Sequence, residues 1–78
     1  MDQYSFTVEI DGAITQNPQF EDIVYEAGCN DGLIAVIDGK TLIDFDRSAA
    51  SYTNAVESAV AALQGIGATI VSVFPITD

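Results

Sequence analysis

Several residue types that build catalytic and metal sites are missing or nearly missing from this chain. It has no histidine, no tryptophan and a single cysteine, Cys29. An intramolecular disulfide is therefore impossible, and zinc sites built from cysteine and histidine are excluded. Because no histidine is present to activate Cys29 as a nucleophile, we interpret it as a small apolar residue at the end of a helix. A lone thiol also fits a reducing cytosol.

Positive charge is just as scarce. Lys40 and Arg47 stand against twelve acidic residues, which gives a formal net charge of −10. Direct nucleic-acid binding is not expected, because it needs lysine and arginine to neutralise phosphates. A negative surplus of this size instead favours a basic protein partner. We expect Arg47 to form a salt bridge with the carboxylate of Asp46, Asp44 or Glu57.

The chain lacks a long apolar run as well. No segment approaches the roughly 18 residues that span a bilayer, and the N-terminus lacks the basic region of a signal peptide. We therefore expect a soluble, cytoplasmic protein with no membrane partner. Hydrophobic residues make up 49% of the chain, so it is not a disordered acidic tail. Its 78 residues are expected to form one small domain, residues 1–78.

The most informative stretch is residues 33–46, which predicts a β-hairpin. Asp38-Gly39 between two apolar runs is typical of a type I′ turn, which needs positive φ at both central residues. Ile37 then pairs with Lys40, and the pairing continues back to Ile34 with Ile43. Side chains alternate between the two faces of a strand, so the face toward the core carries Ile34, Val36, Ile43 and Phe45. The other face, where we expect function, carries Leu33, Ala35, Ile37, Lys40, Leu42, Asp44 and Asp46.

Periodicity predicts the remaining elements. Strands are expected over residues 4–10 and 69–74, a first helix from Asn17-Pro18 to Ala27, and a second helix that Ser48 or Ser51 caps. With right-handed crossovers this order gives an α+β, ferredoxin-like β-α-β-β-α-β sandwich with an antiparallel sheet in the order 4-1-3-2. Two helices cover one face of that sheet, and the other face stays open.

From residue 4 to residue 74 the chain resembles a widespread family of small prokaryotic proteins of obscure function. The shared features are Tyr4-Ser5-Phe6-Thr7, then Tyr25-Glu26-Ala27-Gly28-Cys29 with Asp31, and Asp44-Phe45-Asp46-Arg47 with Ala49. Some members are followed by a helix-turn-helix segment, which implies a regulatory or antitoxin-like role for those. The resemblance implies no catalytic residues. Because the chain ends at Asp78, we expect no DNA-reading module in it.

The candidate partner-binding residues are seven carboxylates: Glu9, Asp11, Glu21, Asp22, Glu26, Asp44 and Asp46. The pair Asp44 and Asp46 leaves cation binding open, but Mg²⁺ or Ca²⁺ needs more oxygen ligands than Ser5 and Thr7 add. We expect a solvated acidic face, with no metal and no cofactor. No apolar cleft is indicated that would tune a carboxylate for acid–base catalysis, so we do not expect an enzyme.

Two functions follow from these residues. The first is a non-enzymatic acidic binding protein that docks on a basic, nucleic-acid-binding surface of a protein partner. In size and charge it is similar to DNA-mimic inhibitors such as anti-CRISPR proteins. The alternative is a regulatory or antitoxin-like dimerisation module, a homodimer joined through the apolar residues Leu33, Ala35, Ile37 and Leu42. A loop or Ile76 covering those residues would remove the second function.

Overall fold

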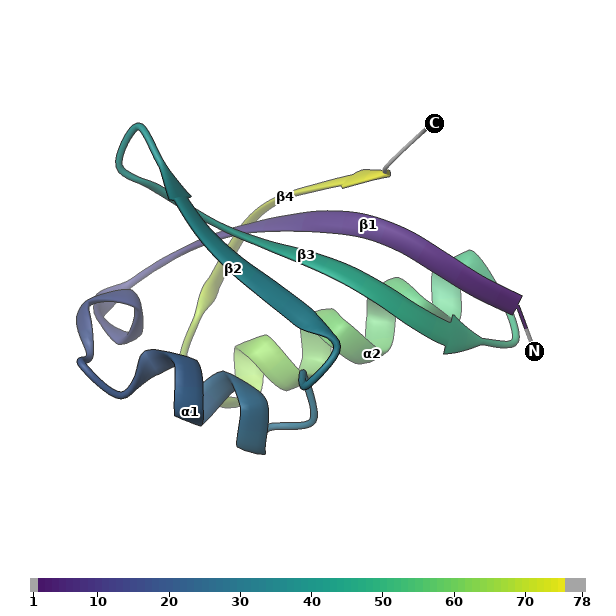
Figure 1. Cartoon of the computed structure of the whole chain (residues 1–78), viewed down its shortest axis with the longest axis horizontal. Helices are drawn as coiled ribbons and strands as arrows, with labels where there is room; N and C mark the ends of the chain where they lie inside the picture. Colours follow the sequence, from purple (N-terminus) through teal and green to yellow (C-terminus); the bar gives the residue numbers. More distant parts are fainter. Residues whose placement is uncertain (1, 76–78) are drawn as a thin grey trace.

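Four strands form a single antiparallel sheet in the computed structural model, which describes residues 2–75 (Figure 1). The strands are β1 (Asp2–Asp11), β2 (Gly32–Ile37), β3 (Lys40–Ala49) and β4 (Thr69–Pro75). Helices α1 (Phe20–Glu26) and α2 (Tyr52–Gly65) lie against one face of the sheet, and a short 3-10 helix, η1 (Ala13–Gln16), follows β1. The α+β class is confirmed, and so is the placement of both helices on one face.

The order across the sheet is β2-β3-β1-β4, and the same series counted from the other edge is 4-1-3-2. The central pair, β1 and β3, runs from Asp2 opposite Ala49 to Ile10 opposite Thr41. The β1–β4 pairing carries a register shift between Glu9 and Ile10. Strand β2 is therefore an edge strand, and of the predicted hairpin only this first strand lies at the border of the sheet, because β3 is central.

The predicted hairpin is confirmed in turn and register. Asp38 has a φ of 52° and Gly39 a φ of 77°, the two positive values that a type I′ turn requires. Ile37 lies opposite Lys40, and Ile34 lies opposite Ile43. Figure 1 shows the tip of this hairpin projecting away from the helices.

Helix α1 begins later than the sequence predicts. Asn17 does not cap it: the Asn17 side chain accepts a hydrogen bond from the Gln19 N–H at 2.8 Å and closes a turn of its own. The helix starts at Phe20, and Gln19 is the residue that precedes it at the N-cap position. It ends as predicted, with Gly28 at a φ of 96° and the Cys29 N–H donating to the Val24 carbonyl at 3.2 Å.

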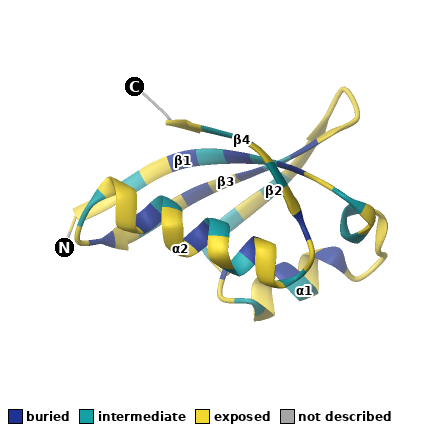
Figure 2. Cartoon of the chain, turned by 180° about the vertical axis from the view of Figure 1, so that it is seen from behind, coloured by how far each residue is buried: buried dark blue, intermediate teal, exposed yellow. Residues whose placement is uncertain are grey.

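Helix α2 begins after Ser51, whose hydroxyl accepts a hydrogen bond from the Asn54 N–H at 3.1 Å. Three small or apolar residues on one side of the helix are buried against the sheet: Ala55, Ala59 and Leu63. Figure 2 shows this pattern as buried positions recurring along α2 between exposed ones. The alanines allow the helix to approach the sheet closely.

The core lies between the sheet and the helices. Its centre is the stacked pair Phe6 and Phe45, whose ring centroids lie 5.2 Å apart, in the central strands. Val36 was predicted to share this core, and that prediction is wrong, because 69% of Val36 is exposed. The reason is a hollow of about 430 Å³ that separates this end of β2 from η1 and α1.

Candidate functional site

The sheet face opposite the helices brings together four of the seven predicted carboxylates. They are Glu9 and Asp11 on β1 and Asp44 and Asp46 on β3. Each aspartate of β3 accepts a hydrogen bond from the hydroxyl across the strand: Thr7 donates to Asp44 at 2.6 Å, and Ser5 donates to Asp46 at 3.2 Å. These pairs hold the carboxylates in fixed positions, with their remaining lone pairs free for other donors.

The other three predicted carboxylates lie in the helix layer. Glu21 and Asp22 occupy the first turn of α1, where the helix dipole favours negative charge, and Glu26 is its last residue. All three are exposed. The seven carboxylates therefore do not form one patch, since the sheet itself separates the two groups.

The arrangement of Asp44 and Asp46 is that of a hydrogen-bonding surface. Within residues 2–75, no three acidic, cysteine or histidine side chains converge closely enough to hold a metal ion. Ionised carboxylates that already accept one hydroxyl form charge-assisted hydrogen bonds with lysine or arginine side chains. A cationic partner group is thus the chemistry that these two residues fit best.

The predicted self-association residues lie beside these carboxylates on the same face. Leu33 is 73% exposed and Ile37 is 54% exposed, while Ala35 is exposed and Leu42 is half-buried. Leu33 lies directly opposite Asp44 in the β2–β3 pairing. Ile76, which was considered as a cover for this face, lies outside the described residues. An exposed apolar strip thus lies beside the carboxylates of the sheet face.

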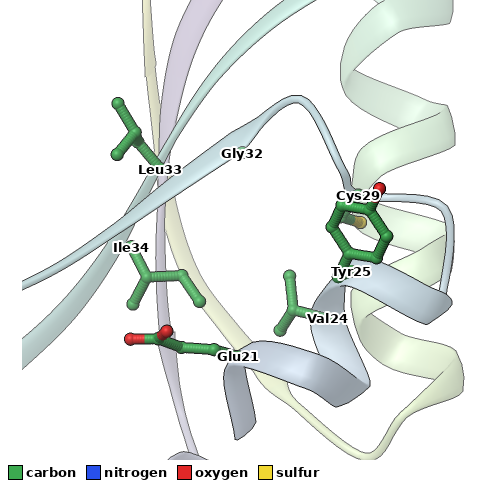
Figure 3. Close-up of a pocket in the computed structure, with 7 residues that line it drawn as sticks. All are labelled: Glu21, Val24, Tyr25, Cys29, Gly32, Leu33 and Ile34. Atoms are coloured by element: carbon green, nitrogen blue, oxygen red, sulfur yellow. The ribbon is translucent and has the colours of Figure 1, made fainter.

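A groove between β2 and α1 is a feature that the sequence did not reveal. One hollow of about 240 Å³ is lined by Val24, Cys29 and Ile34, with Glu21 and the exposed ring of Tyr25 at its rim (Figure 3). Ile34 and Glu21 also line the hollow of about 430 Å³ beside Val36. The two hollows therefore adjoin, and together they form what we call the β2–α1 groove.

Arg47 does not pair with Asp44, Asp46 or Glu57, as the sequence predicted. It forms a two-pronged salt bridge with Asp31, with Nε 2.9 Å from Oδ2 and Nη2 2.8 Å from Oδ1. The predicted partners on β3 were wrong because alternation places Asp44 and Asp46 on the opposite sheet face. Sequence reasoning missed Asp31 because it lies in the turn before β2, 16 residues away.

Three more contacts make Arg47 a clamp between elements. It donates to the Gly28 carbonyl at 3.0 Å and to the Ser58 hydroxyl of α2 at 2.9 Å, and its guanidinium lies 5.1 Å from the centre of the Phe45 ring. Hydrogen bonding to Arg47 lowers the pKa of Asp31 and raises the pKa of Arg47 itself. The clamp joins the end of α1 to β3 and α2.

Cys29 completes this cluster as a buried residue. Only 1% of it is exposed, and burial raises the pKa of its thiol, although nearby Arg47 acts in the opposite direction. The thiol form is therefore favoured, as expected for a residue that fills space beneath the cap of α1. Gly28, Cys29, Asp31 and Arg47, all part of the sequence pattern noted above, thus meet in a cluster whose contacts are structural.

No helix within residues 2–75 has the length and apolar character to cross a membrane. No protein-family model, curated protein or solved structure matches this chain.

Proposed function

We propose that this protein is a non-enzymatic binding protein that docks on a basic surface of a protein partner. One observation carries the proposal: the sheet face free of helices presents Asp44 and Asp46 together with exposed apolar side chains, Leu33 opposite Asp44 and Ile37 opposite Lys40 near the hairpin turn. Cationic side chains of the partner would bond to the carboxylates, and apolar side chains would bury the strip. The carboxylates would attract the basic partner, and the apolar strip would exclude water from the contact.

The balance of charge supports a basic partner. Of the two cations, Arg47 is engaged with Asp31, which leaves Lys40 as the other positive side chain facing twelve carboxylic acids. The field around the sheet face is therefore negative, and it would speed the approach of a positive surface in a salt-dependent way. A lysine- and arginine-lined nucleic-acid site, of the kind that DNA-mimic inhibitors such as anti-CRISPR proteins occupy, is the partner surface that fits best.

The fold supports the same function. The order of elements and the two helices on one face favour a ferredoxin-like sandwich, in which one sheet face is available for contact. A partner that binds nucleic acid would be met in the cytoplasm, which is the location we propose. The family resemblance adds no catalytic residue to this picture.

Charge reversal on the sheet face tests the proposal. Immobilised protein would capture its partner from cell extract at low salt, and Asp44→Lys with Asp46→Lys should abolish capture. Glu26→Lys with Glu57→Lys makes the same change in net charge in the helix layer, so it should retain capture. Captured protein should elute as salt rises. Equal capture by the two double variants, or capture indifferent to salt, would contradict the proposal.

The exposure of Leu33 and Ile37 favours a second candidate, a regulatory or antitoxin-like homodimer. Its contact would be the strip of Leu33, Ala35, Ile37 and Leu42. The mass of the protein in solution should then be that of a dimer, and Leu42→Asp should give a folded monomer. A wild-type monomer at high concentration excludes this candidate.

A further inference from the structure

The free edge of β2 has none of the features that shield an edge strand. Its sequence, Gly-Leu-Ile-Ala-Val-Ile, contains no charge and no proline, and its pairing with β3 carries no bulge. The opposite edge differs, because β4 ends at Pro75 and its pairing with β1 is irregular. Charges, prolines and bulges are the means by which proteins prevent edge pairing. Strand β2 is therefore open to a further strand.

The hairpin geometry identifies which backbone groups are free at this edge. Ile37 and Lys40 flank the two-residue turn, so they exchange both of their hydrogen bonds. Alternation then directs the N–H and C=O groups of Ile34 and Val36 away from β3. The Gly32 N–H, which has the same parity, donates to the Cys29 carbonyl at 3.0 Å instead of to β3. Ile34 and Val36 are thus spaced as an added strand requires.

The two flanks of β2 call for different side chains on an added strand. On the open face such a strand would lie beside Leu33 and Ile37, which are apolar. On the helix side it would lie over the β2–α1 groove, where the carboxylate of Glu21 extends beside Ile34 (Figure 3). The groove lining includes Glu21 and Asp22 but no lysine or arginine. Alternating apolar and basic residues match these two flanks.

We infer that the partner inserts an extended segment along β2, with its backbone paired to Ile34 and Val36 and its lysine or arginine side chains beside Glu21. The inference rests on the proposed function, because it specifies how the same basic partner is held. A second copy of this chain fits less well. Its own β2 supplies no cation for Glu21, and each copy carries a net charge of −10.

Two synthetic peptides test the inference. One is an alternating valine–lysine hexapeptide, as long as the six residues of β2. The other is the same peptide N-methylated at each residue, which keeps the charge but removes the backbone donors. In titrations followed by NMR, the first should bind about tenfold more tightly than the second. Binding should also slow amide exchange at Ile34 and Val36.

Variants of the protein separate the contributions of backbone and charge. Val36→Pro removes an outward N–H that β3 does not use, so it should weaken peptide binding about tenfold, whereas Val36→Thr should retain it. Glu21→Lys should also weaken binding, and Glu57→Lys on α2 is its matched control. Far-UV circular dichroism and thermal unfolding of each variant would verify that the sheet is intact.

Three outcomes would overturn the inference. The first is equal affinity for the two peptides, and the second is no detectable binding of either peptide at millimolar concentration. In both cases the charge-reversal capture experiment would still decide the proposed function separately. The third is a wild-type dimer that Val36→Pro converts to a monomer with peptide binding unchanged, which would place a second copy at the edge.

Discussion

The salt bridge between Arg47 and Asp31 ties the turn between α1 and β2 to β3. Both side chains are partly buried, and the two-pronged geometry is the strong form of an arginine–carboxylate pair. Loss of either partner would leave the other charge without compensation in a partly buried place, where such loss is costly. One of the molecule's two cations therefore has a structural role, and the local sequence did not identify its partner.

The Asp31 pair predicts how stability responds to acid. Because Arg47 lowers the pKa of Asp31 in the folded chain, this pair stabilises the fold fully above the ordinary pKa of an aspartate, near 4. The stabilisation is lost as the pH falls through the lower pKa of the folded state. In urea unfolding from about pH 7 to pH 2, Asp31→Asn should be less stable than wild type at neutral pH. The difference should shrink in acid.

Asp38→Asn is the control for this prediction. Asp38 lies exposed at the hairpin turn, in a conformation that asparagine also tolerates. Its difference from wild type at neutral pH should be small, since its side chain takes no part in the Arg47 pair. A difference between wild type and Asp31→Asn that stays constant over the whole pH range would contradict the assigned role of the pair.

The elements differ in how far local sequence determines them. The hairpin was predictable because Asp38-Gly39 fixes both the turn and the register. The cap at Gly28 was predictable for a similar local reason. The start of α1 was not, because Asn17 closes a separate turn through its side chain. The resulting helix of seven residues leaves Val36 uncovered, so the groove depends on packing that no local pattern encodes.

Close packing at the start of β2 predicts the effect of a single methyl group. A Cβ on Gly32 would lie 2.8 Å from Ile43 Cγ2, inside the core, so Gly32→Ala should destabilise the fold by about 1–3 kcal/mol. Gly65, at the end of α2, has open space around it, and Gly65→Ala should stabilise by about 0.5–1 kcal/mol. Urea unfolding of both variants measures these changes. Equal effects of the two alanines would show that the contact at Gly32 is unimportant.

At the scale of the whole molecule, the carboxylates are distributed over two layers of a body that measures 34 × 25 × 16 Å. At about 0.01 M salt the screening length is about 30 Å, so the acids of the sheet face and of α1 repel one another across the entire protein. The sequence predicted the surplus of charge but not its division, because which side of the sheet a residue occupies is decided by the packing of the elements. Repulsion of this kind opposes folding.

Salt should therefore stabilise the protein. Raising sodium chloride from about 0.01 M to 0.5 M should increase the free energy of unfolding by about 1 kcal/mol, measured by urea titration at neutral pH. Asp44→Lys with Asp46→Lys changes the net charge from −10 to −6, since each replacement adds two charges, and should reduce the salt effect. Two results would contradict this account. One is a free energy of unfolding of the wild type that falls as salt is added, and the other is a salt effect that is larger in the double variant than in the wild type.

The position of Tyr25 gives the unmodified protein an optical probe. There is no tryptophan, and of the three tyrosines, Tyr4 and Tyr52 contact each other edge to face at the start of α2. Tyr25 stands apart, 64% exposed on the rim of the β2–α1 groove (Figure 3). A neutral quencher such as acrylamide would therefore reduce the emission of Tyr25 more than that of Tyr52, which is 37% exposed. A ligand that fills the groove would protect Tyr25 from the quencher, so its binding could be followed without an attached label.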